Sequence, residues 1–513
     1  MSTAVTGERH TGGGARAPKA TARQWLGLTI MVVPLFMLAT DVTALYLAMP
    51  AISADLAPTG SQSLWILHIG EFLTAATMIT FGLLTRRIGA RRLLLGAVAA
   101  YGLASLTAAF AADAEMLILA RAVLGVGAAA FTPAGLVMIR TTFQDDRQYG
   151  IAFALFMAAF SGGMAAGPPF GGFILEHFWW GTVFLINVPI AAVLLLSGPL
   201  LLPRNHADRT VRIDLASVLL SVAAILALVY GMQEIAASGP DPISVASAVL
   251  GMILVLVFLR RQARTVHPLL DLSLFHSRVF SGLLVVLFLV MLGTMFVDML
   301  MAQHLQMVRG LSPWEAGLVL LAPAVAATVG TAAAPLADRG GPVVGGLLLG
   351  IGGAAGLMLA LRLPESGVVE LAALLAVTML MAAPYITLLS QRLIGAAPVE
   401  KTGSATALQE VAASLGGASS IALMGAGALM IHRTVLGSAA PGSLDPEVVD
   451  AAGESFGAAP AAAVGLEASD ADALLHAADA GLTAATQAGY LVFSLVVLLT
   501  AVGIVVFGRR FRG

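Results

Sequence analysis

Long apolar runs, separated by short polar segments, recur along the whole of this 513-residue chain. A helix needs about 20 mostly apolar residues to cross a bilayer, and fourteen segments meet that length. The first eight lie near residues 25–49, 63–84, 93–111, 116–138, 149–175, 182–202, 215–236 and 243–259. The last six lie near residues 279–303, 316–336, 343–361, 368–389, 404–431 and 484–507. The pattern therefore predicts an all-α polytopic membrane protein with 14 transmembrane helices.

We expect these helices to form two six-helix bundles with two further helices between them, a 6+2+6 arrangement. Residues 25–202 would be the N-terminal bundle, 203–278 a linker carrying the two extra transmembrane helices, and 279–507 the C-terminal bundle. The polar segments 1–24 and 508–513 are expected to be cytoplasmic tails. In such an architecture the substrate binds between the bundles, near the middle of the membrane.

Two loops support an internal repeat. Residues 82–92 (GLLTRRIGARR) and 334–341 (APLADRGG) both open with small residues and continue with arginine and glycine. They follow the second helix of the first predicted bundle and the second helix of the last. This correspondence favours two related blocks of six helices.

The basic residues test the number of helices. With fourteen spans, 23 of the 27 Lys and Arg residues fall on one side of the membrane, together with both termini. Cytoplasmic loops are enriched in Lys and Arg, so this side is predicted to be the cytoplasm. The five tryptophans lie at predicted span ends, where interfacial aromatic residues gather.

The composition excludes several classes of protein. The chain is 58% hydrophobic and only 11% charged, whereas soluble domains are nearer one quarter charged. It has no cysteine, and no span clusters His, Asp and Glu at metal-ligand spacing, so we expect no metal and no cofactor. An intramembrane enzyme would need such a set, and a sensor would need a soluble output domain. The arginines are spread over membrane loops, which gives no support for binding nucleic acid.

One apolar segment, residues 158–175, is rich in helix-breaking residues. Such residues are tolerated in a membrane helix, where small side chains permit close packing against neighbouring helices. We interpret the segment as a bent, tightly packed hinge helix; the alternative is an ordinary span with small-residue packing. The residues on which this hypothesis rests are Gly162, Gly163, Gly167, Pro168, Gly171 and Gly172.

Ionisable residues inside a membrane are costly and are therefore functional candidates. Asp41 and Arg121 both fall in the outer half of their predicted spans. An arginine facing Asp41 would stabilise the carboxylate, and protonation of Asp41 would release that arginine, which is the outline of a proton-coupling element. The alternative is a permanent ion pair that braces the two helices.

Four further residues complete this set. Asp298 lies in the first span of the second block, as Asp41 does in the first, and is either a second proton site or an acid near the interface. Glu410 would attract a cationic substrate or carry a proton, unless its side chain reaches back to the interface. Glu71 lies in the second span, and His68, one turn earlier, could tune it or simply be packed.

The longest polar segment, residues 433–482, carries eight acidic residues and one arginine between the last two predicted spans. It is expected to be an external loop. Two alternatives remain: a solvated acidic loop, or a surface that concentrates cations near an external mouth.

Several motifs resemble those of the major facilitator superfamily, and within it the 14-helix drug:proton antiporters that export quaternary ammonium compounds and dyes. The run 167–172 (GPPFGG) is similar to the antiporter motif of the fifth helix, and Asp41 opens a first-helix motif of this group. Arg121, with Gly125 and Gly127, resembles the fourth-helix motif, whose arginine the family uses in proton coupling. Residues 179–189, 306–317 and 415–417 are also similar, so the resemblance covers nearly the whole chain.

The resemblance further implies gates on the cytoplasmic side in the two repeated loops. The residues concerned are Gly82, Arg86, Arg87, Gly89, Asp338 and Arg339. The chain departs from the family pattern at Arg86, where the family has an aspartate, whereas the matching Asp338 is present. It departs again at Leu124, which replaces a frequent glutamine, and at Ser414, where some relatives have a second acid.

We therefore expect a proton-driven exporter of lipophilic cations, such as quaternary ammonium compounds, dyes and viologens, in the inner membrane of a bacterium. Asp41, Arg121 and Asp298 are the candidates for proton coupling, and Glu410, Glu71 and His68 those for binding substrate. The partners are small cations, protons and the bilayer, and the chain is expected to be a monomer. The alternatives are a dedicated exporter of a host-made antibiotic or an importer of a solute.

Overall fold

The computed structural model describes residues 19–203, 214–239, 241–265, 272–339, 341–398 and 401–507, and their regular structure is helical throughout. The first ten helices are α1 (Ala22–Leu56), α2 (Gly60–Ile88), α3 (Ala90–Ala109), α4 (Ala114–Ala128), α5 (Phe131–Thr142), α6 (Asp146–His177), α7 (Thr182–Leu185), α8 (Asn187–Leu201), α9 (Leu215–Ser238) and α10 (Pro242–Gln262). They are followed by η1 (Leu272–His276), α11 (Arg278–Gln303), η2 (His304–Val308), α12 (Pro313–Arg339), α13 (Gly341–Arg362), α14 (Val368–Gly395), α15 (Thr402–Ala439), α16 (Pro446–Ala452), α17 (Ala459–Ala462) and α18 (Ala468–Phe507).

Most of the predicted spans are long apolar helices. Within the described residues, 12 helices are long and apolar enough to cross a membrane, or 13 if the bent α2 is one span. The pairs α4 with α5 and α7 with α8 each count as a single span in that set. The thirteenth predicted span, residues 404–431, lies in α15, a helix of 38 residues that is not part of the set. The number fourteen, like the cytoplasmic position of the termini, stays a prediction.

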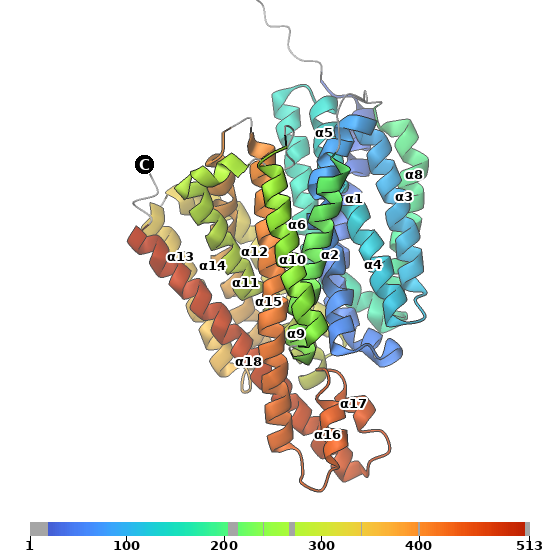
Figure 1. Cartoon of the computed structure of the whole chain (residues 1–513), viewed down its shortest axis with the longest axis vertical. Coiled ribbons are helices and arrows are strands. Elements are labelled where there is room, and N and C mark those ends of the chain that lie inside the picture. The colour runs from blue at the N-terminus through green and yellow to red at the C-terminus, as the bar shows by residue number, and fades with distance from the viewer. Residues whose placement is uncertain are drawn as a thin grey trace, which may run out of the picture.

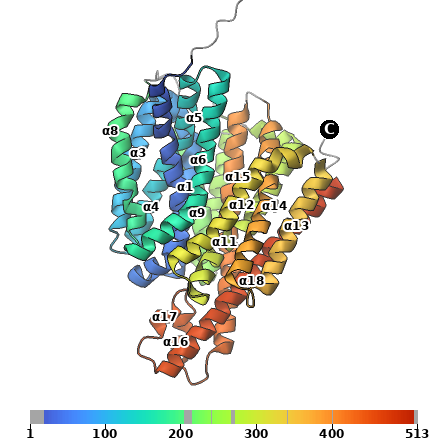
Figure 2. The same ribbon diagram turned by 180° about the vertical axis from the view of Figure 1, so that it is seen from behind.

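Two groups of helices lie side by side (Figure 1). Helices α1 to α8 pack together in what we call the N-terminal bundle, and α11 to α15 pack with α18 in the C-terminal bundle. On one face α9 contacts both α2 and α15, while α10 packs on α9, so this pair lies over the seam between the bundles. On the opposite face α6 packs along α12 (Figure 2).

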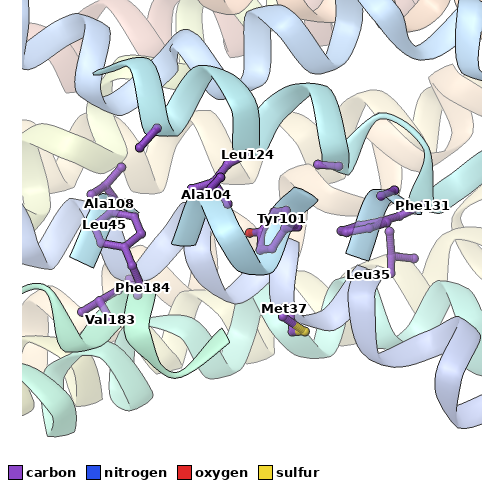
Figure 3. Close-up of a cluster of buried hydrophobic side chains, with 14 of the residues drawn as sticks. Leu35, Met37, Leu45, Tyr101, Ala104, Ala108, Leu124, Phe131, Val183 and Phe184 are labelled. Atoms are coloured by element: carbon purple, nitrogen blue, oxygen red, sulfur yellow. The ribbon is translucent and has the colours of Figure 1, made fainter. Parts of the chain in front are cut away.

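The core of the N-terminal bundle is made of large apolar side chains from helices far apart in the chain (Figure 3). Leu35 of α1, Tyr101 of α3, Phe131 of α5 and Phe184 of α7 all belong to one buried cluster. The rings of Tyr101 and Phe131 lie 5.4 Å apart. Because side chains from four helices interdigitate here, the bundle forms a rigid frame for the polar groups within it.

Helix α6 approaches its neighbours so closely that side chains are excluded at several glycines. A Cβ on Gly163 would lie 2.6 Å from the Phe36 carbonyl oxygen of α1. On the α12 side, a Cβ on Gly172 would lie 2.3 Å from the Pro313 carbonyl oxygen. The helix is continuous from Asp146 to His177 with Pro168 and Pro169 inside it. The glycines thus let one helix touch both bundles.

The remaining predicted hinge residues differ in their surroundings. Cβ atoms on Gly167 and Gly171 would meet Thr43 and Ala44 of α1, and the backbone of Pro168 is close to Gly317 of α12. Gly162, in contrast, has no atom within 4 Å of the position of a Cβ. Close packing therefore explains five of the six predicted hinge positions, and Gly162 lies beside open space.

The segment predicted as an external loop is largely helical. Residues 433–482 contain the end of α15, the short helices α16 and α17, and the beginning of α18, and project from one end of the bundles (Figure 1). Leu436, Leu444 and Leu474 are buried together in a small core of its own. Because this segment is predicted to be external, we call this part the external subdomain and the end that carries it the outer end. Helix α1 begins, and α18 ends, at the opposite end.

The two extra helices are tied together by close packing and an ion pair. A Cβ on Gly231 of α9 or Gly251 of α10 would meet the backbone of the other helix at 2.4 Å. At their ends Arg261 donates hydrogen bonds to both carboxylate oxygens of Asp214, at 2.9 and 3.0 Å. Hydrogen bonds from Arg261 and Ser217 lower the pKa of Asp214 to about 2. The bridge is therefore ionised throughout the physiological pH range.

The neighbouring glycines 162 and 163 provide a matched test of this packing. We expect Gly163→Ala to destabilise the protein by about 1–3 kcal/mol, because the new methyl group meets backbone that cannot move cheaply. Gly162→Ala should be neutral or slightly stabilising, since alanine favours helix and nothing lies in its way. Thermal unfolding of the purified proteins in detergent measures both. Equal midpoints for the two variants would contradict the observed packing.

Candidate functional site

A buried ion pair lies in the middle of the N-terminal bundle. Arg121 of α4 donates a hydrogen bond of 2.6 Å to Oδ2 of Asp41 on α1, and the two side chains are 3% and 2% exposed. Arg121 also donates to the backbone carbonyls of Ile66 and Leu67 on α2, each at 3.1 Å. One guanidinium therefore connects three helices. The structure brings together the two residues that the sequence analysis singled out for proton coupling.

Glycines at a helix crossing make this reach possible. A Cβ on Gly125 of α4 would lie 2.1 Å from the carbonyl oxygen of Gly70 on α2, so the two backbones touch. The Thr74 hydroxyl donates to the carbonyl oxygen of Gly125 at 2.9 Å across the same crossing. Arg121 lies one turn before Gly125 on the same helix. Because α4 and α2 are so close at this crossing, its side chain reaches the backbone carbonyl oxygens of Ile66 and Leu67 on α2.

One oxygen of Asp41 makes no hydrogen bond of standard geometry. Oδ1 is buried, and the buried Tyr101 hydroxyl is a nearby donor that interacts weakly with this carboxylate. The guanidinium of Arg121 also lies 6.0 Å from the centre of the Phe184 ring. A carboxylate with one oxygen bound to arginine and the other without a standard hydrogen bond has a position available for a proton.

A small cavity with an empty volume of ≈ 420 Å³ adjoins Asp41 between α1, α6 and the α7–α8 segment. Asn187 also lines it, and the Asn187 amide nitrogen is buried without a partner. No role is predicted for Asn187 or Tyr101 from the sequence. Both are polar residues within apolar segments, which is the signal that could have identified them.

Three further carboxylates lie near one another across the two bundles. Glu71 of α2 and Asp298 of α11 both interact electrostatically with Tyr46 of α1, and Glu410 of α15 interacts with Glu71. Asp298 is exposed although the adjacent Val297 and Met299 are buried. Since it interacts with Tyr46 of the opposite bundle, it lies at the interface between the bundles.

These carboxylates are not neutralised by a basic side chain. Within the described part of the chain, neither Asp298 nor Glu410 forms a salt bridge, and the partner of Glu71 is His68, at 3.5 Å. His68 is buried, and its Nε2 has no hydrogen-bond partner. The described residues also contain no group of His, Asp and Glu able to hold a metal ion. The space between the bundles is thus an acidic surface suited to an organic cation.

The predicted gate residues lie at the end opposite the external subdomain. Arg86 and Arg87 are exposed at the end of α2, and Gly89, with φ of 91°, forms the tight connection to α3. Gly82 faces open space, and Arg339 is exposed at the end of α12. The side chain of Asp338 lies outside the described residues. The structure therefore does not bring the gate residues of the two bundles into contact in its described part.

Comparison with known proteins decides the family. A profile described as "Major Facilitator Superfamily" matches residues 32–421, well over half of the chain. The chain belongs to the major facilitator superfamily. One relative is the "Multidrug efflux pump LfrA" of Mycolicibacterium smegmatis, 34% identical over 515 residues that cover 99% of this chain and 100% of the relative. Another is the "Methyl viologen resistance protein SmvA" of Salmonella typhimurium, 35% identical over 89% of this chain and 92% of the relative.

Solved structures agree with this fold. A bacterial homologue of the human lysosomal transporter Spinster, in its inward-facing and unoccupied conformation, superposes with a TM-score of 0.66 over 96% of this chain and 98% of that one, at 15% identity. This major facilitator protein is therefore a transporter and not an enzyme. Its apolar helices and bacterial relatives are those of a multi-pass protein of the inner membrane.

The ion pair predicts strong coupling between Asp41 and Arg121. Arg121→Gln should destabilise this transporter by about 3–5 kcal/mol, because it leaves a carboxylate buried without its cation. The double variant Asp41→Asn/Arg121→Gln should lose less stability than the sum of the two single changes. Unfolding free energies of the four proteins in detergent give the coupling. Strictly additive losses would show that the two charges do not interact.

Proposed function

We propose that this transporter exports lipophilic organic cations in exchange for protons. The names of its relatives support drug efflux, since one is a multidrug efflux pump and another confers resistance to methyl viologen, itself an organic dication. The identity to LfrA extends over the full length of both chains. A shared length and topology favour a related substrate class, and the acidic residues suggest what that class is.

The convergence of Glu71, Asp298 and Glu410 between the bundles is the observation that carries the proposal. Their mutual repulsion in a partly buried space is relieved by a cation, and an aromatic cation adds apolar contacts without needing many hydrogen bonds. Tyr46, which interacts with Glu71 and Asp298, adds an aromatic ring beside them, and aromatic rings attract cations. A neutral or anionic substrate would gain nothing from three carboxylates that form no salt bridge with Lys or Arg among the described residues.

Asp41 and Arg121 supply the proton site in this proposal. With Asp41 ionised, Arg121 is held between the carboxylate and the α2 carbonyls; with Asp41 protonated, the attraction to Arg121 falls. Helix α2 also carries Glu71, one turn beyond Leu67. A change in the hydrogen bonds from Arg121 to the α2 carbonyls would therefore act on the helix that carries Glu71, one of the acids proposed to bind the substrate.

The bundles are closed against each other at the outer end. Besides the Gly172 contact, the Phe173 ring of α6 packs edge-on against Trp314 of α12, and Ser312 lies 3.4 Å from Glu176. Rocking of one bundle against the other is the usual way in which such transporters alternate access. In our proposal the outer contacts of α6 with α12 separate when the cation is released.

Transport in inverted vesicles tests the proposal. We expect ethidium uptake into acidified inverted vesicles, coupled to release of protons, and loss of at least about tenfold in rate for Asp41→Asn, because the proton site is gone. Glu410→Gln should raise the concentration of ethidium needed for half-maximal transport by about tenfold, because the bound cation loses its charge-assisted interaction with the Glu410 carboxylate.

Glu365→Gln is the matched control. Glu365 is exposed between α13 and α14, away from the carboxylates of the seam, so the same chemical change should leave transport unaltered. If the parent moves no cation and releases no proton, the proposed function is wrong, and export of a host-made antibiotic becomes the better hypothesis. If Glu410→Gln matches the parent, that acid does not bind the substrate.

A further inference from the structure

A second cavity lies directly beneath the external subdomain. Its empty volume, open to solvent on one side, is ≈ 650 Å³, and residues of α1, α2, α11, η2 and α15 line it. Its walls are mostly apolar and include Met49, Met299 and Met307 together with Phe296 and Phe456. Methionine adapts its shape to ligands of different outline, and it also packs favourably on aromatic rings. None of Glu71, Asp298 and Glu410 lines this cavity.

One polar side chain in this cavity lacks a partner. Gln303, at the end of α11, lines the cavity and is only 8% exposed, and its Oε1 is buried without a hydrogen bond. Leaving a buried acceptor unpaired costs about 1–3 kcal/mol. A donor on a bound ligand would recover that cost. The π-helical turn η2 begins at the next residue, and such turns occur frequently at functional sites.

The cavity continues the path outward from the carboxylates. Leu67, which lines it, precedes Glu71 by one turn of α2, a rise of about 6 Å. On α11, Met299 lines the cavity and directly follows Asp298. On the outer side, the loop from Glu454 to Gly457 of the external subdomain covers it. The cavity therefore lies between the central acids and the exterior, in contact with both bundles.

We propose that this cavity is a second, outer binding site for exported aromatic cations that carry an N–H donor, with Gln303 Oε1 accepting from that donor. The inference rests on the proposed function, because it takes its ligand from the substrate class of the central site. A cation leaving Glu71 and Asp298 would enter it before Phe456 and its loop release the cation to the exterior. The apolar walls bind the ring system, and Gln303 discriminates among cations by their donors.

Cysteine labelling tests the outer site without interference, since the chain has no cysteine of its own. Ser455→Cys places a thiol in the cavity wall, and Ser443→Cys places one on an exposed surface of the same subdomain. Maleimide labelling of both is followed in detergent with ethidium, which has two aromatic amines, or with tetraphenylphosphonium, which has no donor. The Glu71→Gln/Glu410→Gln background removes central acids that could account for protection.

We expect ethidium to slow labelling of Ser455→Cys and not of Ser443→Cys, in the parent and in the central-acid background alike. Gln303→Leu, added to Ser455→Cys, should raise the ethidium concentration for half-protection by about tenfold, the loss of one buried hydrogen bond, and leave that of tetraphenylphosphonium within about twofold. Far-UV circular dichroism and the unchanged tetraphenylphosphonium value show that Gln303→Leu is folded.

Two results would overturn the outer site. Unprotected Ser455→Cys in a protein that still transports ethidium would remove the outer site and leave the proposed function standing. Equal effects of Gln303→Leu on both cations would remove the hydrogen bond that defines its specificity. If the parent vesicles transport no cation at all, the proposed function fails. The outer site then fails with it, because its ligand would not be an exported substrate.

Discussion

The rest of the N-terminal bundle depends on the need to hold the charge of Arg121 in a buried position. An arginine 3% exposed is tolerable only if its hydrogen-bond donors are satisfied, and three of them are, by Asp41 and by two carbonyls of α2. That requirement explains the glycines at the crossing of α2 and α4, because a side chain at either Gly70 or Gly125 would push the helices apart. It also explains why an apolar core with large rings surrounds the pair, since such a core excludes water and fixes the geometry.

The ionisable groups fall into two sets that differ in what neutralises them. Asp41 has its own cation, whereas Glu71, Asp298 and Glu410 do not, and they come from both bundles. In the proposed mechanism the first set handles the proton and the second the substrate, and α2 connects them because it contacts Arg121 and carries Glu71. Separating the two tasks lets a proton and a cation act on the same helix without competing for one carboxylate.

The two faces of the seam between the bundles are closed in different ways. On one face glycine-rich α6 meets α12 backbone to backbone at Gly172 and Gly317, and small residues permit this close approach. On the other, α9 bridges α2 and α15, fastened to α2 by a hydrogen bond of 2.7 Å between Ser61 and Glu234 and by the ring contact of Trp65 with Tyr230. The helices α9 and α10 thus cover this face of the seam. At the outer end the external subdomain covers the remaining cavity.

The order of apolar segments predicted a helical membrane protein, because a bilayer admits only segments of a narrow length and low charge. Charged residues are rare in membrane spans because burying a charge in lipid is costly, and this made Asp41, Arg121, Asp298 and Glu410 candidates. The glycines of residues 158–175 predicted a closely packed helix.

The sequence alone could not show that Arg121 also binds the carbonyls of α2, since backbone groups are the same in every residue. Tyr101, Asn187 and Gln303 are recognisable in the sequence as polar residues of apolar segments, but only the surrounding helices decide which of their atoms lack a well-formed hydrogen bond. The acidic segment 433–482 looked like a loop because its few leucines are far apart in sequence, and only folding brings Leu436, Leu444 and Leu474 into one core. Local composition determined which segments enter the membrane, while contacts between distant helices decided which polar atoms meet and which are left for a ligand or a proton.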